Sequence, residues 1–71
     1  MPILIAPQNC PLRVVRIAAD EKTKMRLESM GIAVNGEVTV VSSFGGSVVC
    51  RVKDGRVALD RNVCMKIIVA A

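Results

Sequence analysis

The chain has 71 residues, of which 52% are hydrophobic and one, Phe44, is aromatic. That length supports a single hydrophobic core, so we expect one domain over residues 1–71. The formal net charge is +4 and the chain contains no His, which excludes Ser-His-Asp and Cys-His catalysis and argues against an enzyme.

The first predicted elements are a strand and a helix. A β-branched run at residues 12–17 predicts the first strand, and residues 3–5 are expected to lie along the sheet as an edge segment. Asp20 offers an N-cap oxygen to a helix of about ten residues. That helix is expected to end at Met30, because Gly31 supplies a left-handed C-terminal stop.

The predicted helix has one buried and one exposed face. At helical spacing, Thr23, Leu27 and Met30 share the face that turns toward the core. Met25 falls almost opposite, where a large apolar side chain gains nothing from the core. We therefore expect Met25 to be exposed.

The second strand is predicted at residues 37–42, after a turn at Asn35-Gly36. Val38 and Val40 lie on one face of this strand. Residues 43–46 are expected to form a flexible connection. At the other end of the chain, residues 60–64 are expected to make a single turn before a last strand at residues 65–70.

An Asp-Gly dipeptide at residues 54–55, between two β-rich runs, is typical of a two-residue hairpin turn. Such a turn pairs Val52 with Val57. Cys50 then faces Leu59, so that the apolar alternation of both strands falls on one side. In this register Val49 lies on the opposite face and points outward.

The predicted order is strand, short helix, two or three meandering strands, a one-turn connection and a closing strand. About five short strands bury one face each and leave few open edges when they close into a small barrel. The apolar runs fall short of the roughly 20 residues that cross a bilayer. The first residues also lack the features of a secretory signal, so we expect a cytoplasmic location and no membrane insertion.

Residues 26–36 carry the most specific pattern in the chain. They read Arg-Leu-Glu-Ser-Met-Gly-Ile-Ala-Val-Asn-Gly, which resembles the Arg-Leu and Gly-Ile motif of the FeoA family, the ferrous iron transport protein A domains. Residues 37–40, 57–59 and 64–69 extend the resemblance over residues 12–69. Cys64 stands where the family usually has Ala. The fold-defining positions of the match are Leu27, Gly31, Gly36, Ile67 and Val69.

The resemblance implies a mainly β fold, a small SH3-like β-barrel with one short α-helix between the first and second strands. It also implies a non-enzymatic accessory protein of bacterial ferrous iron uptake. Such a protein docks on the cytosolic part of FeoB, a membrane permease with a GTPase domain, and modulates it. No cofactor, no metal ligand and no nucleic acid is expected, and weak self-association is left open.

A protein that works by docking must use its outer surface. The side chains predicted to contact the partner lie on the exposed side of the helix and on the outward face of the strand before the Asp-Gly turn. They are Met25, Arg26, Ser29, Val49 and Arg51.

Two other functions stay open at this stage. The net charge of +4 suggests a small basic barrel that binds nucleic acid, although acidic residues interrupt the basic ones throughout. A direct metal carrier would have to use Cys10, Cys50 and Cys64. These three thiols are far apart in sequence and lack the Cys-x-x-Cys spacing of a zinc or redox motif.

Overall fold

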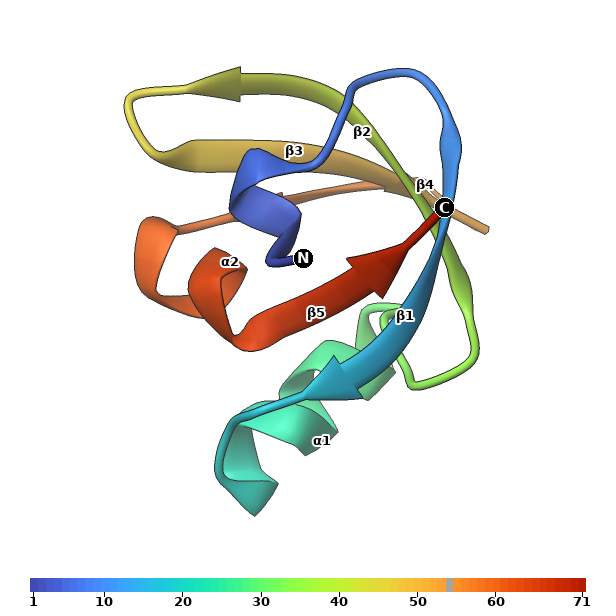
Figure 1. Cartoon of the computed structure of the whole chain (residues 1–71). Helices are drawn as coiled ribbons and strands as arrows, with labels where there is room; N and C mark the ends of the chain where they lie inside the picture. Colours follow the sequence, from blue (N-terminus) through green and yellow to red (C-terminus); the bar gives the residue numbers. More distant parts are fainter. Residues whose placement is uncertain (54) are drawn as a thin grey trace.

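The sheet is one continuous antiparallel array in the order β4-β3-β2-β1-β5 (Figure 1). This computed structural model describes residues 1–53 and 55–71. The predicted mainly β fold, with a helix between the first and second strands, is confirmed. The elements are the 3₁₀ helix η1 (Ile3–Ile5), β1 (Pro11–Ile17), α1 (Glu21–Ser29), β2 (Glu37–Phe44), β3 (Ser47–Val52), β4 (Gly55–Leu59), α2 (Arg61–Lys66) and β5 (Ile67–Ala70).

Two β-bulges bend this single sheet around a core. The pairing of β1 with β5 shifts between Val14 and Arg16, and that of β2 with β3 shifts between Val40 and Ser42. Each shift inserts one unpaired residue, which bends its strand and increases the local twist. The two long strands can therefore serve both walls of the barrel.

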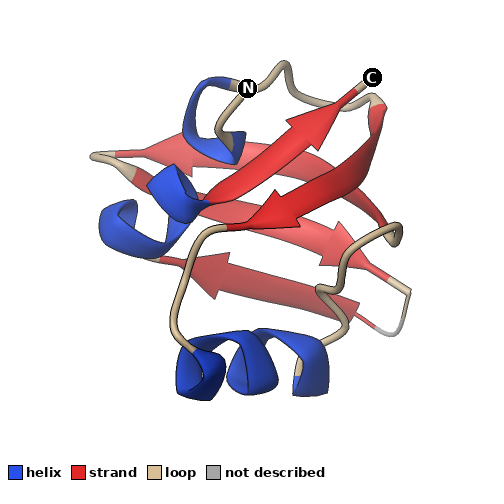
Figure 2. Ribbon diagram, turned by 60° about the horizontal axis from the view of Figure 1, so that its bottom comes forward, coloured by secondary structure: helices blue, strands red, loops and turns tan. Residues whose placement is uncertain are grey.

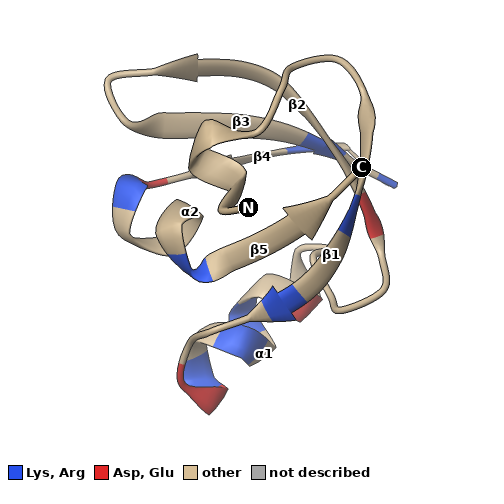
Figure 3. Ribbon diagram, viewed as in Figure 1, with Lys and Arg blue, Asp and Glu red and all other residues tan. Residues whose placement is uncertain are grey.

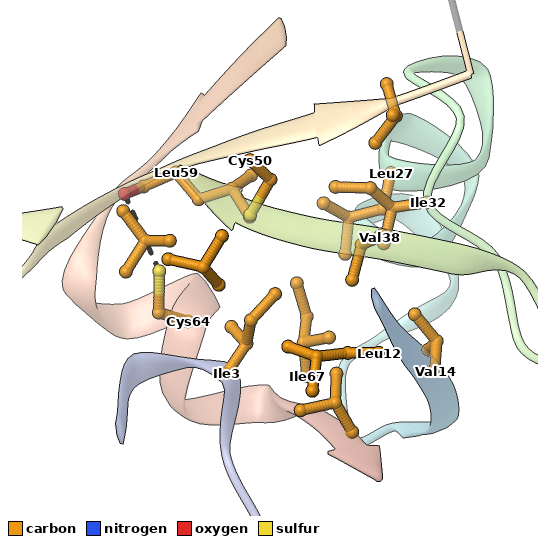
Figure 4. Close-up of a cluster of buried hydrophobic side chains, with 14 of the residues drawn as sticks. Ile3, Leu12, Val14, Leu27, Ile32, Val38, Cys50, Leu59, Cys64 and Ile67 are labelled. Atoms are coloured by element: carbon orange, nitrogen blue, oxygen red, sulfur yellow. Dashed lines mark hydrogen bonds between the residues drawn. The ribbon is translucent and has the colours of Figure 1, made fainter. Parts of the chain in front are cut away.

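The core is aliphatic and contains two thiols but no ring. Strand alternation aims every second side chain inward, and the helices add a few more from outside the sheet (Figure 4). The buried hydrophobic residues are Ile3, Leu12, Val14, Ile17, Leu27, Ile32, Val38, Val40, Val48, Cys50, Val52, Leu59, Cys64, Ile67 and Val69.

The helix α1 forms as its sequence predicts and lies across one end of the barrel (Figure 2). Asp20 caps it, since its carboxylate accepts a hydrogen bond from the Thr23 backbone N–H at 2.8 Å. Gly31 follows with φ +95°, and the Ile32 N–H donates to the Leu27 carbonyl at 2.8 Å. Leu27 is buried and Met25 is 66% exposed, so both predictions are confirmed.

Residues 3–5 are not the extended edge segment that we expected. They form one 3₁₀ turn, which places the Ile3 side chain fully inside the core. The residues before the turn do pair with the sheet. The Met1 amine donates to the Val69 carbonyl at 3.0 Å, the Val69 N–H donates to Met1 at 2.7 Å, and Pro2 bridges to Ile68.

The β2–β3 hairpin is longer than predicted. Residues 43–46 are not a flexible connection, because β2 continues to Phe44, which pairs with Ser47. Only Gly45 and Gly46 form the turn, with φ values of +58° and +85°. Two successive glycines take positive φ without steric cost, and such a turn matches the twist of the strands that flank it.

The β3–β4 register differs from the prediction by two residues. Val52 pairs with Gly55 and Cys50 with Val57, while Val48 faces Leu59. Gly55 therefore belongs to the strand, and Asp54 lies outside the described residues. Because side chains alternate with a period of two, a shift by two leaves each residue on its predicted face.

Residues 60–64 form more than the single turn we expected. The Asp60 carboxylate accepts a hydrogen bond from the Val63 N–H at 2.9 Å, and this cap starts a six-residue helix, α2, that runs to Lys66. The last strand consequently begins at Ile67 rather than at residue 65. Within the described ranges no ladder joins β4 to β5, so α2, and not hydrogen bonding between these two strands, closes the barrel.

Candidate partner-binding surface

The two buried cysteines are held as neutral thiols. Burial raises the pKa of Cys50 to about 11 and also raises the pKa of Cys64. The Cys64 Sγ donates to the Leu59 carbonyl at 3.6 Å. A thiol is a poor nucleophile and a poor metal ligand until it ionises, so this geometry favours a packing role over a chemical one for both residues.

Carboxylates in the described residues are dispersed. Asp20 and Asp60 use their oxygens as helix caps, and hydrogen bonds from Thr23 lower the pKa of Asp20. Across residues 1–53 and 55–71, no three His, Cys, Asp or Glu side chains gather as a possible metal site. The helices in the same ranges are all too short or too polar to span a membrane.

Basic side chains are spread over several elements (Figure 3). They occur on β1, α1, β3, β4 and α2, and acidic residues at the start of α1, at the start of β2 and before α2 lie among them. A duplex or single strand of nucleic acid is held by a continuous basic face. This distribution does not favour the nucleic-acid alternative.

Three of the predicted contact residues lie together on the outer side of α1. Met25, Arg26 and Ser29 are all exposed. The Ser29 hydroxyl donates to the Arg26 carbonyl at 2.7 Å, which satisfies that hydroxyl within the helix. Met25 and Arg26 therefore supply the apolar area and the charge of this side.

The other two predicted residues lie on the outward face of β3. Val49 is half-buried and Arg51 is exposed, while the alternate residues Val48, Cys50 and Val52 point inward. The outward orientation of Val49 is confirmed. The predicted set is thus divided between α1 and β3, and β4 lies between these two elements (Figure 2).

A groove follows β4 beside the α1 group. One hollow of about 180 Å³ lies between α1 and β4, and its lining includes Arg26, Met30 and Ala58. A second hollow of about 440 Å³ continues along the strand and shares Met30 and Ala58 with the first. Together they form what we call the β4 groove. Its lining residues are Thr23, Arg26, Leu27, Met30, Val52, Gly55, Arg56, Val57, Ala58, Leu59, Asp60 and Val63.

Another hollow lies on the far side of β3. It has a volume of about 530 Å³ and lies where the loop before β2 approaches the outer face of the sheet. Arg51, Lys53 and Glu37 line it together with the backbone of Gly31 and Gly36. Arg51 therefore belongs to this hollow, and Arg26 belongs to the β4 groove.

Sequence reasoning missed the β4 groove as a site. The predicted strands include β4, but a pattern of alternating side chains does not reveal which strand lies at an edge of the sheet. The exposed Arg56 and the half-buried Met30 were the only local signs, and each has an ordinary explanation on a solvated surface.

Comparison with known proteins connects the whole chain to one family. A family model described as the FeoA domain matches residues 1–71. The sequence has no match among curated proteins.

Several solved structures share the fold. A crystal structure described as the iron uptake regulatory protein FeoA superposes with a TM-score of 0.85 at 22% identity, covering 97% of this chain and 92% of that one. The solution structure of iron(II) transport protein A from Clostridium thermocellum gives 0.91 at 20% identity, covering all of this chain and 45% of that one. A FeoA-like protein from Clostridium acetobutylicum gives 0.82 at 15% identity, covering 100% and 85%. These likenesses confirm the predicted small barrel.

Proposed function

The chain belongs to the FeoA domain family, and from this premise we propose that it is a non-enzymatic accessory protein of ferrous iron uptake. It acts in the cytoplasm by docking on the cytosolic part of a FeoB-type permease that carries a GTPase domain, and it modulates that permease. Two solved relatives are described as an iron uptake regulatory protein and an iron(II) transport protein, which supports the same pathway for this chain.

The observation that carries the docking role is the outer side of α1. Leu27 of α1 packs in the core, whereas Met25 on the same helix is 66% exposed. The exposed Arg26 lies beside Met25. An apolar side chain next to a guanidinium is the composition found in the energetic centres of protein interfaces. Val49, beyond β4, extends this apolar area toward the outer face of β3.

The test is capture of the detergent-solubilised permease by the purified domain. We expect Met25→Asp combined with Val49→Asp to weaken capture by about tenfold or more, because a carboxylate would have to be desolvated in the contact. Met65→Asp combined with Val34→Asp is the matched control, since both residues are exposed, at 53% and 50%, and lie outside α1 and β3. Equal capture by the double variant and the natural chain would exclude this surface.

A further inference from the structure

The two edge strands of the sheet, β5 and β4, differ in whether another segment of the chain pairs with their outer edge. The outer edge of β5 is covered, because Met1 exchanges two hydrogen bonds with Val69 and Pro2 bridges to Ile68. The outer edge of β4 has no such cover. Among the described residues, no backbone hydrogen bond links residues 55–59 to anything other than the neighbouring β3.

The β3–β4 register identifies the backbone groups that remain free on β4. Val52 and Gly55 flank a connection of two residues, so they must form a hydrogen-bonded pair. Such pairs alternate along an antiparallel ladder. The pairs Cys50–Val57 and Val48–Leu59 are then bonded as well, and residues 56 and 58 direct their N–H and C=O groups away from β3. These donors and acceptors form a template for another strand.

The β4 groove provides space beside this template. Its two hollows of about 180 and about 440 Å³ follow β4 from end to end. On the far side the lining comes from Thr23 of α1, from Met30 directly after α1, and from Val63 of α2. A helix cannot pair with a strand edge, so α1 forms a wall without satisfying the free groups on β4.

The charges that line the β4 groove determine which kind of strand could bind beside β4. Arg26 rises from the α1 wall and Arg56 from β4 itself, and both are exposed. The acidic side chain at the α2 end, Asp60, uses a carboxylate oxygen to cap α2. A strand with carboxylates would pair with both guanidinium groups. A second copy of β4 would instead bring like charges together, which destabilises a strand pair.

We propose that the β4 groove binds an extended acidic segment of a partner protein, which adds to the sheet as a new strand beside β4. Main-chain hydrogen bonds to residues 56 and 58 give this segment its affinity. Alternate side chains point toward Met30 and Val63, where apolar groups fit, and toward the guanidinium groups of Arg26 and Arg56, where carboxylates fit. The inference goes beyond docking on a permease, because it concerns a different mode of contact and holds for any protein that supplies the segment.

The first test uses a synthetic peptide of about seven residues, the length of an ordinary strand, that alternates Val and Glu. We expect it to shift the amide resonances of Arg56 and Ala58 most strongly and to slow hydrogen exchange at these two amides. The same peptide with N-methyl groups on alternate residues along its bonding edge should bind at least about tenfold more weakly, since it cannot complete the ladder. Equal binding of both peptides, or the largest shifts on β5, would overturn the proposal.

The second test changes the charge of the groove. Arg26→Glu with Arg56→Glu should weaken binding of the Val-Glu peptide by about tenfold or more. Arg16→Glu with Lys22→Glu is the matched control, because it makes the same net charge change at an exposed strand residue and an exposed α1 residue outside the groove. An equal loss in both pairs would show a general charge effect and refute the proposal. Dimerisation of the chain that competes with the peptide would refute it as well, in favour of a second copy as the occupant.

Discussion

At the scale of single residues, the thiols of Cys50 and Cys64 are titratable groups that are completely shielded from solvent. Cys50 lies on β3 and Cys64 on α2, and each occupies a fully enclosed core position that a small apolar residue could also fill. All three cysteines are free thiols, and Cys10 is half-exposed. Cys50 and Cys64 therefore pack as small hydrophobes.

The raised pKa of Cys50 makes the free energy of unfolding depend on pH. Burial raises that pKa from 9.0 to about 11. Above pH 9 the unfolded chain loses this proton first, so the native state binds more protons and stability falls as pH rises from about 9 to 11. Below pH 9 both states hold the proton and the effect vanishes. Urea unfolding between pH 8 and 10.5 should show this decline in the natural chain.

Replacing Cys50 by Ala isolates this contribution. The Cys50→Ala variant should lose less stability over the same pH interval, although it starts lower because it leaves a small cavity. Cys10→Ala serves as the control, since Cys10 is not enclosed. A pH dependence that is identical in the natural chain and in Cys50→Ala would contradict the assignment.

At the scale of elements, capping residues in the sequence located the ends of helices correctly, but the length of the second helix was not predicted. Asp20 and Gly31 marked both ends of α1 in the sequence, because a cap oxygen and a positive φ are local requirements. The same signal at Asp60 was read as one turn, although it starts a helix that continues to Lys66. Helix length there depends on Cys64 reaching the core, which is a tertiary contact.

The Asp60 cap offers a direct test of α2. Asp60→Ala should lower the free energy of unfolding by about 1 kcal/mol, because it leaves the Val63 N–H without its partner. Asp60→Asn should retain nearly all of the stability, since an Asn side-chain oxygen accepts the same hydrogen bond. Thermal or urea unfolding of the two variants measures the difference. Equal loss in both would show that the charge of Asp60, rather than the cap, matters.

Register shows which part of a strand prediction is physically determined. The apolar alternation of β3 and β4 assigned the faces correctly, because a shift by one residue would expose every buried side chain. A shift by two costs far less, so the pattern could not distinguish the predicted pairing of Cys50 with Leu59 from the observed pairing with Val57. Local sequence determined the faces, and the turn determined the partners.

At the scale of the whole molecule, the barrel depends on segments that are distant in sequence. The β1–β5 ladder and the contact of η1 with α2 join the two ends of the chain. The sequence predicted the fold class and the outward faces of Met25 and Val49. It could not show that β4 is an open edge, because strand order is set by pairing across the whole chain. The β4 groove was missed for this reason.

Ile3 should be far more important for stability than its place near one end of the chain suggests. It is fully buried, whereas Ile5, two residues later in η1, is 70% exposed. Ile3→Ala should lower the free energy of unfolding by about 3 kcal/mol through lost burial and a residual cavity. Ile5→Ala, the matched control, should change it by less than about 0.5 kcal/mol. Comparable losses in the two variants, measured by urea unfolding, would contradict the placement of η1.

The bulge between Val40 and Ser42 has a consequence for how this domain tolerates changes in chain length. Removing Val41 would restore an uninterrupted ladder with β3 and take away the bend that lets β2 serve two walls. The flanking pairs, Val40 with Cys50 and Ser42 with Val49, would keep their faces, so the lost bend and not a change of face is the cost of the deletion. Single-residue deletions at the two bulges should therefore be among the least tolerated in the domain, whereas exchanging the side chain of Val41 leaves the curvature intact.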